Sequence, residues 1–160
     1  MEILQVRFAA QMQQTRDLFR EYFGFLRRDH GLDISYQGVA EELAALPGEF
    51  APPRGRLIIA IDSGKAAGCA AFRPLRANTC EMKRMYVLPE FRGRGVGRSL
   101  AERLIQEARQ IGYEYMRLDT ANLLVAAISL YESLGFRPIV PYNEVPEELQ
   151  SVAVHMELVL

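Results

Sequence analysis

Cysteine is scarce in this sequence of 160 residues, and it has no long apolar run and no excess of charge of either sign. Two cysteines, Cys69 and Cys80, are too few for the disulfide framework of a small secreted domain, and we expect both to be buried thiols. No apolar run approaches the roughly 18 residues that a membrane-spanning helix needs. The first residues lack a basic segment followed by an apolar one, so we expect no signal peptide and a cytoplasmic location.

The charge balance points to no polyanionic partner. The 19 basic residues face 20 acidic ones, which gives a formal net charge of −1. A nucleic acid or an anionic membrane surface would favour a strongly basic chain, so we expect neither as a partner. No histidine, cysteine or carboxylate spacing is typical of a metal site, so no metal is expected. The length is typical of one domain, and we predict a single domain over residues 1–160.

The period of the apolar positions predicts the order of elements βααβββαβαββ. Strands in the first half adjoin one another, whereas those in the second half alternate with helices. The predicted fold class is therefore α/β, with a mixed, largely antiparallel sheet and helices on both faces. The expected strands are 3–8, 57–61, 66–72, 79–87, 115–119, 137–140 and 152–159, and the expected helices are 11–29, 39–46, 97–111 and 124–134. The last strand is expected to be open, which is compatible with a homodimer.

The strongest chemical signal is a turn rich in glycine and arginine between the strand 79–87 and the helix that follows it. Glycines at alternate positions allow positive φ angles and close approach of the backbone. The free amides of the first helical turn and the helix dipole favour an anion, and phosphate fits best. Arginines beside these amides add fixed positive charge. The turn consists of Arg92, Gly93, Arg94, Gly95, Val96, Gly97, Arg98 and Ser99.

Two familiar phosphate loops do not match this turn. A Walker A loop requires Gly-Lys followed by Ser or Thr, which is absent. The dinucleotide-binding fingerprint requires a third glycine where Arg98 stands. A diphosphate cradle of another kind remains, and a tight turn with solvated arginines is the alternative.

The segment from Met85 to Leu100 (MYVLPEFRGRGVGRSL) resembles the signature of the GNAT superfamily of acyl-CoA-dependent N-acetyltransferases, with Arg92 to Gly97 in the place of its Arg/Gln-x-x-Gly-x-Gly/Ala motif. The later segment LYESLGF, which contains Tyr131, resembles a second motif of that family. The order of the elements matches over nearly the whole chain. One position departs from the family: Leu124 stands where many members have an asparagine that contacts coenzyme A.

The resemblance implies a binding site for acetyl-CoA, used as a co-substrate. The backbone amides from Arg92 to Arg98, with Ser99 nearby, would hold the diphosphate. The strand end formed by Met85, Tyr86 and Val87 would pair with the pantetheine arm. The N–H of Val87 would lie near the thioester oxygen, where charge develops during the reaction.

The resemblance also assigns a general acid. Tyr131 matches the tyrosine that protonates the departing thiolate in that family. The helical period alone places Tyr131 on one face with Leu124 and Ile128, which is the pattern of a packed core tyrosine.

Glu81 is the candidate base for the acceptor amine, directly or through water, since family members often have a carboxylate there. A surface Glu–Lys pair with Lys83 is the alternative. Strand alternation predicts two faces, one with Glu81, Lys83 and Met85 and the other with Cys80, Met82, Arg84 and Tyr86.

The predicted activity is therefore the direct transfer of an acetyl group from acetyl-CoA to a primary amine in a ternary complex. A small-molecule amine or an amino-acid-like acceptor is favoured over a protein. The alternative is a non-catalytic domain that binds acyl-CoA.

Overall fold

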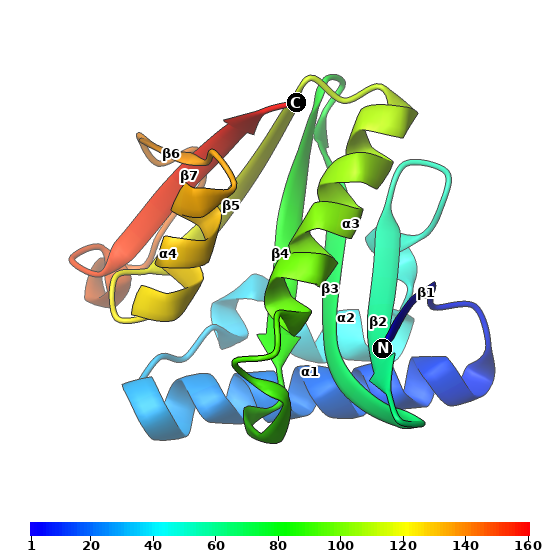
Figure 1. The fold of residues 1–160 in the computed structure, drawn as a ribbon. Coiled ribbons are helices and arrows are strands. Elements are labelled where there is room, and N and C mark those ends of the chain that lie inside the picture. Colours follow the sequence, from blue (N-terminus) through cyan, green and yellow to red (C-terminus); the bar gives the residue numbers. More distant parts are fainter.

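The computed structural model describes residues 1–160, which fold around one seven-stranded sheet in the order β1-β2-β3-β4-β5-β7-β6 (Figure 1). All neighbouring strands are antiparallel except β4 and β5, which are parallel. The predicted mixed, largely antiparallel sheet is confirmed. The strands are β1 (Glu2–Gln5), β2 (Arg56–Asp62), β3 (Lys65–Arg76), β4 (Thr79–Val87), β5 (Tyr115–Ala121), β6 (Arg137–Ile139) and β7 (Ala153–Val159).

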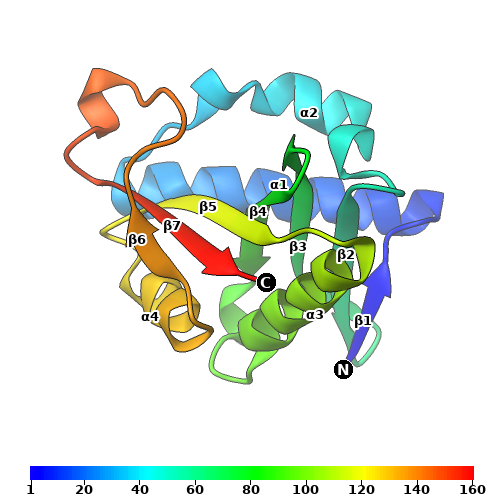
Figure 2. The same cartoon turned by 90° about the horizontal axis from the view of Figure 1, so that it is seen from above.

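Four α-helices cover the two faces of the sheet, as the sequence predicts. Helices α1 and α2 lie over one face and α3 and α4 over the other (Figure 2). The helices are α1 (Ala9–His30), α2 (Val39–Ala45), α3 (Val96–Ile111) and α4 (Val125–Ser133). No helix has the length and apolarity that crossing a membrane requires.

The period of the apolar residues explains how the longest helices pack. In α3 the buried Leu100, Leu104 and Ala108 recur every four residues and form one stripe against the sheet. The helix ends at Gly112, whose φ of 105° is easily adopted only by glycine. The longer α1 ends in the same way at Gly31, with a φ of 63°. These end points agree with the sequence to within a few residues.

The last strand is not an edge of the sheet. β7 pairs with β5 on one side and with the short β6 on the other, so the expectation of an open last strand is wrong. The chain folds back far enough after Phe136 for three residues of β6 to pair with β7. The edges are therefore the short strands β1 and β6, and the support that an open last strand lent to a homodimer is lost.

The two parallel strands at the centre separate after only three residue pairs. Thr79, Cys80 and Glu81 pair with Tyr115, Met116 and Arg117, and no pair follows. β4 continues to Val87 and β5 to Ala121, and Figure 1 shows the two strands diverging. The sheet thus opens into a wedge whose walls carry unpaired backbone groups.

A bulge in β4 changes which side chains share a face. Cys69 pairs with Tyr86 and Ala71 with Lys83, so two steps on β3 correspond to three on β4. The extra residue is Arg84, whose φ is 59°.

The predicted alternation along β4 is therefore wrong beyond the bulge. Met85 moves to the face of α3, and Arg84 and Tyr86 move to the face of α1 and α2, where Glu81 and Lys83 also lie. A strict period of two cannot hold across an inserted residue.

Candidate active site

The glycine turn ends β4 and begins α3. Gly93 and Gly95 have φ angles of 75° and 78°, which L side chains rarely adopt. Gly95 is the N-cap of α3, and no side chain caps the helix. Ser99 N–H donates to the Gly95 carbonyl at 3.0 Å, which leaves the preceding amides at the open end of the helix. The turn therefore offers backbone donors and the positive end of a helix dipole to an anion.

The three arginines of the turn lie in different places. Arg92 folds back along β4, where its Nε donates to the Val87 carbonyl at 3.0 Å and its guanidinium lies over the Phe25 ring. Arg94 is exposed and forms an ion pair with Asp62 at 3.4 Å. Arg98 donates to Ser133 Oγ at 2.6 Å. Arg94 and Arg98 thus provide charge at the rim, while Arg92 fixes the end of the strand.

The end of β4 presents its backbone to the wedge. Leu88 N–H donates to the Ala67 carbonyl at 2.9 Å, and Gly68 pairs with Val87. Since paired residues alternate between bonded and non-bonded positions in an antiparallel ladder, the Val87 N–H points away from β3 and toward the wedge. This is the N–H group that the sequence singles out.

A cavity of about 580 Å³ runs from the glycine turn into the wedge. The large cavity brings most of the predicted site residues together. Those in its wall are Met85, Tyr86, Val87, Arg92, Gly93, Gly95, Val96, Gly97 and Tyr131. Arg94, Arg98 and Ser99 lie outside its lining, as does Glu81.

A smaller cavity of about 80 Å³ lies on the other side of the wedge, between the end of α1, β5 and the chain that leads into β7. Most of its lining is apolar. The two cavities share the side chains at the centre of the wedge. The shared residues are Tyr22, Lys83, Arg84, Asp119, Thr120 and Leu124.

Tyr131 is buried at the wall of the large cavity, with its ring 5.7 Å from that of Phe136. Its hydroxyl makes no hydrogen bond within the protein. Burial raises the pKa of Tyr131, and the negative charge of Asp119 raises it further, so the phenol stays protonated at neutral pH. Tyr131 is thus both the core tyrosine that periodicity predicts and a free donor at the cavity.

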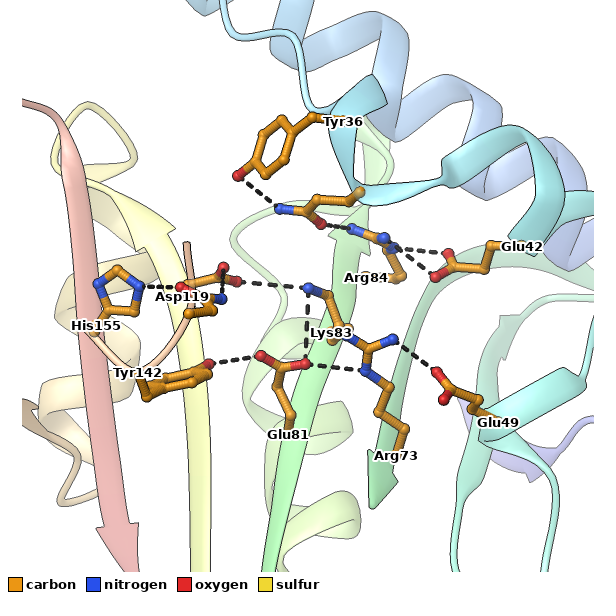
Figure 3. Close-up of polar contacts among 12 residues, drawn as sticks. Tyr36, Glu42, Glu49, Arg73, Glu81, Lys83, Arg84, Asp119, Tyr142 and His155 are labelled. Carbon is orange, nitrogen blue, oxygen red and sulfur yellow. Dashed lines mark hydrogen bonds and ion pairs between the residues drawn. The ribbon is translucent and has the colours of Figure 1, made fainter. Parts of the chain in front are cut away.

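Glu81 lies beneath Lys83 and is 1% exposed. Arg73 Nε donates to its Oε1 at 3.0 Å, and the Tyr142 hydroxyl donates to its Oε2 at 2.7 Å (Figure 3). Burial raises the pKa of Tyr142, which keeps this phenol a donor. Both oxygens of Glu81 are therefore engaged, and the alternative of a surface Glu–Lys pair is wrong because the pair is buried.

Asp119 on β5 is the carboxylate that reaches both cavities. Asn143 donates to its Oδ2 at 3.0 Å and contacts His155 Nε2 at 2.7 Å through its own oxygen. Burial by itself raises the pKa of Asp119, but Lys83, the Asn143 hydrogen bond and His155 together outweigh burial and lower it. Asp119 is therefore ionised at neutral pH.

Arg84 is held by its neighbours on the α2 side of the wedge. Its guanidinium makes two hydrogen bonds to Glu42, at 2.8 and 3.1 Å, and donates to Gln37 Oε1 at 2.8 Å. This pairing anchors α2 and the segment before it to the bulge of β4.

Sequence reasoning missed Lys83, Arg84 and Asp119 as residues of the cavity walls. The available signal was the presence of charged residues within apolar strands, since a buried charge needs partners. The assignment of faces failed because the bulge is not visible in the sequence. Cys69 and Cys80 are buried free thiols, as expected.

Comparison with known sequences identifies the family of this chain. The sequence model described as the acetyltransferase (GNAT) family matches residues 12–136. An N-acetyltransferase of Schizosaccharomyces pombe is 38% identical over 140 residues, covering 86% of this chain and 86% of that protein. N-acetylaspartate synthetase of Rattus norvegicus is 39% identical over 87 residues, covering 54% of this chain and 29% of that protein.

Solved structures share the fold. An acetyltransferase from Streptococcus agalactiae aligns with a TM-score of 0.80 at 20% identity, over 99% of this chain and 98% of that chain. An acetyltransferase from Salmonella typhimurium, solved with its cofactor acetyl-CoA, aligns with a TM-score of 0.67 at 23% identity, over 99% and 93% of the two chains. The family model and the relative from Schizosaccharomyces pombe together show that the chain belongs to the acetyltransferase (GNAT) family.

Proposed function

We propose that the enzyme transfers the acetyl group of acetyl-CoA directly to the primary amine of a small, amino-acid-like acceptor within a ternary complex. The observation that carries this proposal is the meeting of the two cavities at Lys83 and Asp119. One cavity begins at an anion-binding turn and the other has its own apolar wall. Two substrates that enter from opposite sides of the sheet would meet there without a covalent enzyme intermediate.

The residues of the turn fit the diphosphate of acetyl-CoA. Gly97 lies within α3, and a Cβ added to it would meet Leu130 and Val87 at ordinary distances of 3.5 and 3.7 Å. The protein itself therefore does not require glycine at position 97. Because Gly97 has no side chain, a ligand in the cavity could approach the backbone closely at the start of α3. When bound, acetyl-CoA supplies an acetyl thioester.

The end of β4 is suited to hold that thioester. The strand edge beyond Glu81 is unpaired on the side of β5, so Met85, Tyr86 and Val87 can pair with an extended pantetheine arm as an added strand does. The Val87 N–H points into the wedge and is placed to stabilise charge on the thioester oxygen.

We propose Tyr131 as the general acid. A free thiol has a pKa of about 8.5 and a free phenol of about 10, so donation to a thiolate is uphill in water. Burial raises the pKa of Tyr131, but it also disfavours a thiolate in the same cavity. The same desolvation therefore raises both pKa values, and a hydrogen bond from Tyr131 would grow stronger as the sulfur gains charge.

We propose that the acceptor ammonium transfers its proton to one of two carboxylates at the wedge, Glu81 or Asp119. Glu81 is the base that the sequence suggests, and its burial behind Lys83 requires that it act through water or a neighbouring group. Asp119 is the carboxylate with direct access to the cavities. The size of the smaller cavity favours a small acceptor, and N-acetylaspartate, named in the rat relative, is an acetylated amino acid.

An amine library tests the proposal. Wild-type enzyme with acetyl-CoA is screened against amines, amino acids and peptides by detecting the thiol that is released. We expect turnover with a small acceptor, and we expect Tyr131→Phe to lower kcat by about 100-fold, the low end of general acid catalysis. Binding of coenzyme A without thiol release from any amine, together with no effect of Tyr131→Phe, would instead indicate an acyl-CoA-binding domain.

A further inference from the structure

Lys83 stands where the two cavities meet. It lines both, and its side chain is 4% exposed. The Tyr86 hydroxyl is the one fully buried side-chain donor or acceptor that has no hydrogen-bond partner. The Lys83 ammonium also has no hydrogen-bond partner in the protein, so it is not fully buried. Its accessible surface lies at the walls of the two cavities.

The Lys83 ammonium forms two ion pairs but donates no hydrogen bond within the protein. Its nearest carboxylate oxygens are Glu81 Oε1 at 3.8 Å and Asp119 Oδ1 at 3.7 Å, both beyond hydrogen-bonding distance (Figure 3). An ammonium carries three donors, and buried donors are nearly always paired. Arg84, the other cation at the junction, differs because Glu42 and Gln37 already occupy its guanidinium. Lys83 is thus the cation available to a ligand.

Asp119 offers the matching acceptor. Its Oδ2 takes the hydrogen bond of Asn143, whereas its Oδ1 takes none and faces Lys83. The Lys83 ammonium and the Asp119 carboxylate therefore lie side by side at the wall of both cavities, as an ion pair without a hydrogen bond. An α-amino acid carries the complementary pair, because its ammonium and its carboxylate are attached to the same carbon.

We propose that the acceptor is an α-amino acid, whose carboxylate binds Lys83 while its amine lies against Asp119. This inference rests on the proposed function and names its substrate class. The smaller cavity receives the side chain, against the apolar wall of Leu26, Leu32 and Leu149. Its volume of about 80 Å³ has room for about three groups the size of a water molecule, each about 30 Å³, which is the size of a short aliphatic side chain.

Matched pairs of substrates test the proposal on the wild-type enzyme. Each aliphatic amino acid is compared with the amine that lacks only its carboxylate, such as leucine with 3-methylbutylamine and valine with isobutylamine. We expect kcat/KM for the amino acid to be higher by about 10- to 100-fold, the effect of a hydrogen bond to a charged group. Equal or faster turnover of the decarboxylated amines would overturn the proposal and leave the acetyltransferase activity intact.

A variant locates the effect at Lys83. In Lys83→Met we expect the ratio of kcat/KM for the amino acid to kcat/KM for the decarboxylated amine to fall to about one, because the KM of the amino acid rises more than that of the amine. Lys65→Met is the matched control, since Lys65 is the only other lysine and lies exposed at the start of β3. Equal losses for both substrates in Lys83→Met would mean that Lys83 only supports the fold, and the proposal would be wrong.

A binding measurement separates this inference from the proposed function. Calorimetric titration of the wild-type enzyme with coenzyme A present compares N-acetyl-leucine with its neutral amide. Binding that is tighter for the acid by at least about tenfold supports the site even if no turnover is found. Equal affinities, or no binding of either, would overturn the proposal whatever the activity of the enzyme.

Discussion

Glu81 and Lys83 lie two residues apart on β4, yet only Lys83 reaches the cavities. Glu81 is enclosed by Arg73 and Tyr142, which use both of its oxygens. Its negative charge offsets part of the cost of burying the ammonium above it. Burial lowers the pKa of Lys83, and Asp119 and Glu81 counter that shift only in part. The two residues thus form one electrostatic unit, in which Lys83 lines the cavities and Glu81 does not.

The variant Glu81→Gln tests whether Glu81 is the general base. If Glu81 accepts the proton of the acceptor amine, the variant should lower kcat/KM by about 100-fold and move the acidic limb of the pH profile. Asp119→Asn is the comparison, because Lys83 and the Asn143 hydrogen bond outweigh burial and lower the pKa of Asp119, so this carboxylate produces no limb near neutral pH. A profile that keeps its shape in Glu81→Gln would rule out Glu81 as the base.

The element proposed to hold the diphosphate of acetyl-CoA is the turn from β4 into α3. Two of its glycines, Gly93 and Gly95, are required by the backbone, since both have positive φ angles. Gly97 is different because its backbone is helical and its surroundings leave space for a Cβ. The sequence motif thus contains glycines of two kinds, one that shapes the turn and one that leaves room for a ligand.

Gly97→Ala separates these two roles. Alanine is favoured over glycine in a helix by about 1 kcal/mol, so we expect the melting temperature to stay the same or rise. The added methyl group lies at the cavity wall, so we expect the affinity for coenzyme A to fall by about tenfold, measured by calorimetry.

Gly95→Ala is the control for Gly97→Ala, because its φ of 78° makes alanine unfavourable and should lower the melting temperature. Unchanged affinity for coenzyme A in Gly97→Ala would show that no ligand passes close to this position.

At the scale of the whole molecule, the separation of β4 from β5 creates the site. A continuous sheet would fill this space with backbone hydrogen bonds and leave no passage between its faces. Because the strands part after Glu81, elements from both halves of the chain line one cavity. The N-terminal half contributes α1, and the C-terminal half contributes the lining residues of β4, β5 and α4. Occupation of the wedge should therefore stabilise the fold as a unit.

Coenzyme A should raise the melting temperature of the enzyme. At 100 times its Kd a ligand adds about 2.7 kcal/mol, which corresponds to about 5 to 10 °C for a protein of this size. Pantetheine, which lacks the diphosphate, should raise it much less if the glycine turn supplies the main contacts. Thermal denaturation followed by circular dichroism measures both, and equal shifts from the two ligands would contradict diphosphate binding at the turn.

The sequence by itself determined the order of the elements, the ends of the long helices and the glycine turn. These features follow from local rules: the period of the apolar residues, the positive φ that glycine permits, and the open amides at a helix start. The sequence also predicted Tyr131, because it lies in a segment that resembles a family motif and on the apolar face of a predicted helix. The assignments of Glu81 and Tyr131 to chemical steps stay predictions.

Only the tertiary structure decided which charged side chains line the two cavities. The bulge at Arg84 reverses the faces of β4, and such an inserted residue has no local signature in the sequence. Asp119 and Lys83 come from strands that are distant along the chain, and they become neighbours only because β4 and β5 pair in parallel and then separate. Whether a charged residue reaches a cavity depends on this long-range geometry, since every contact that buries or exposes it comes from another part of the chain.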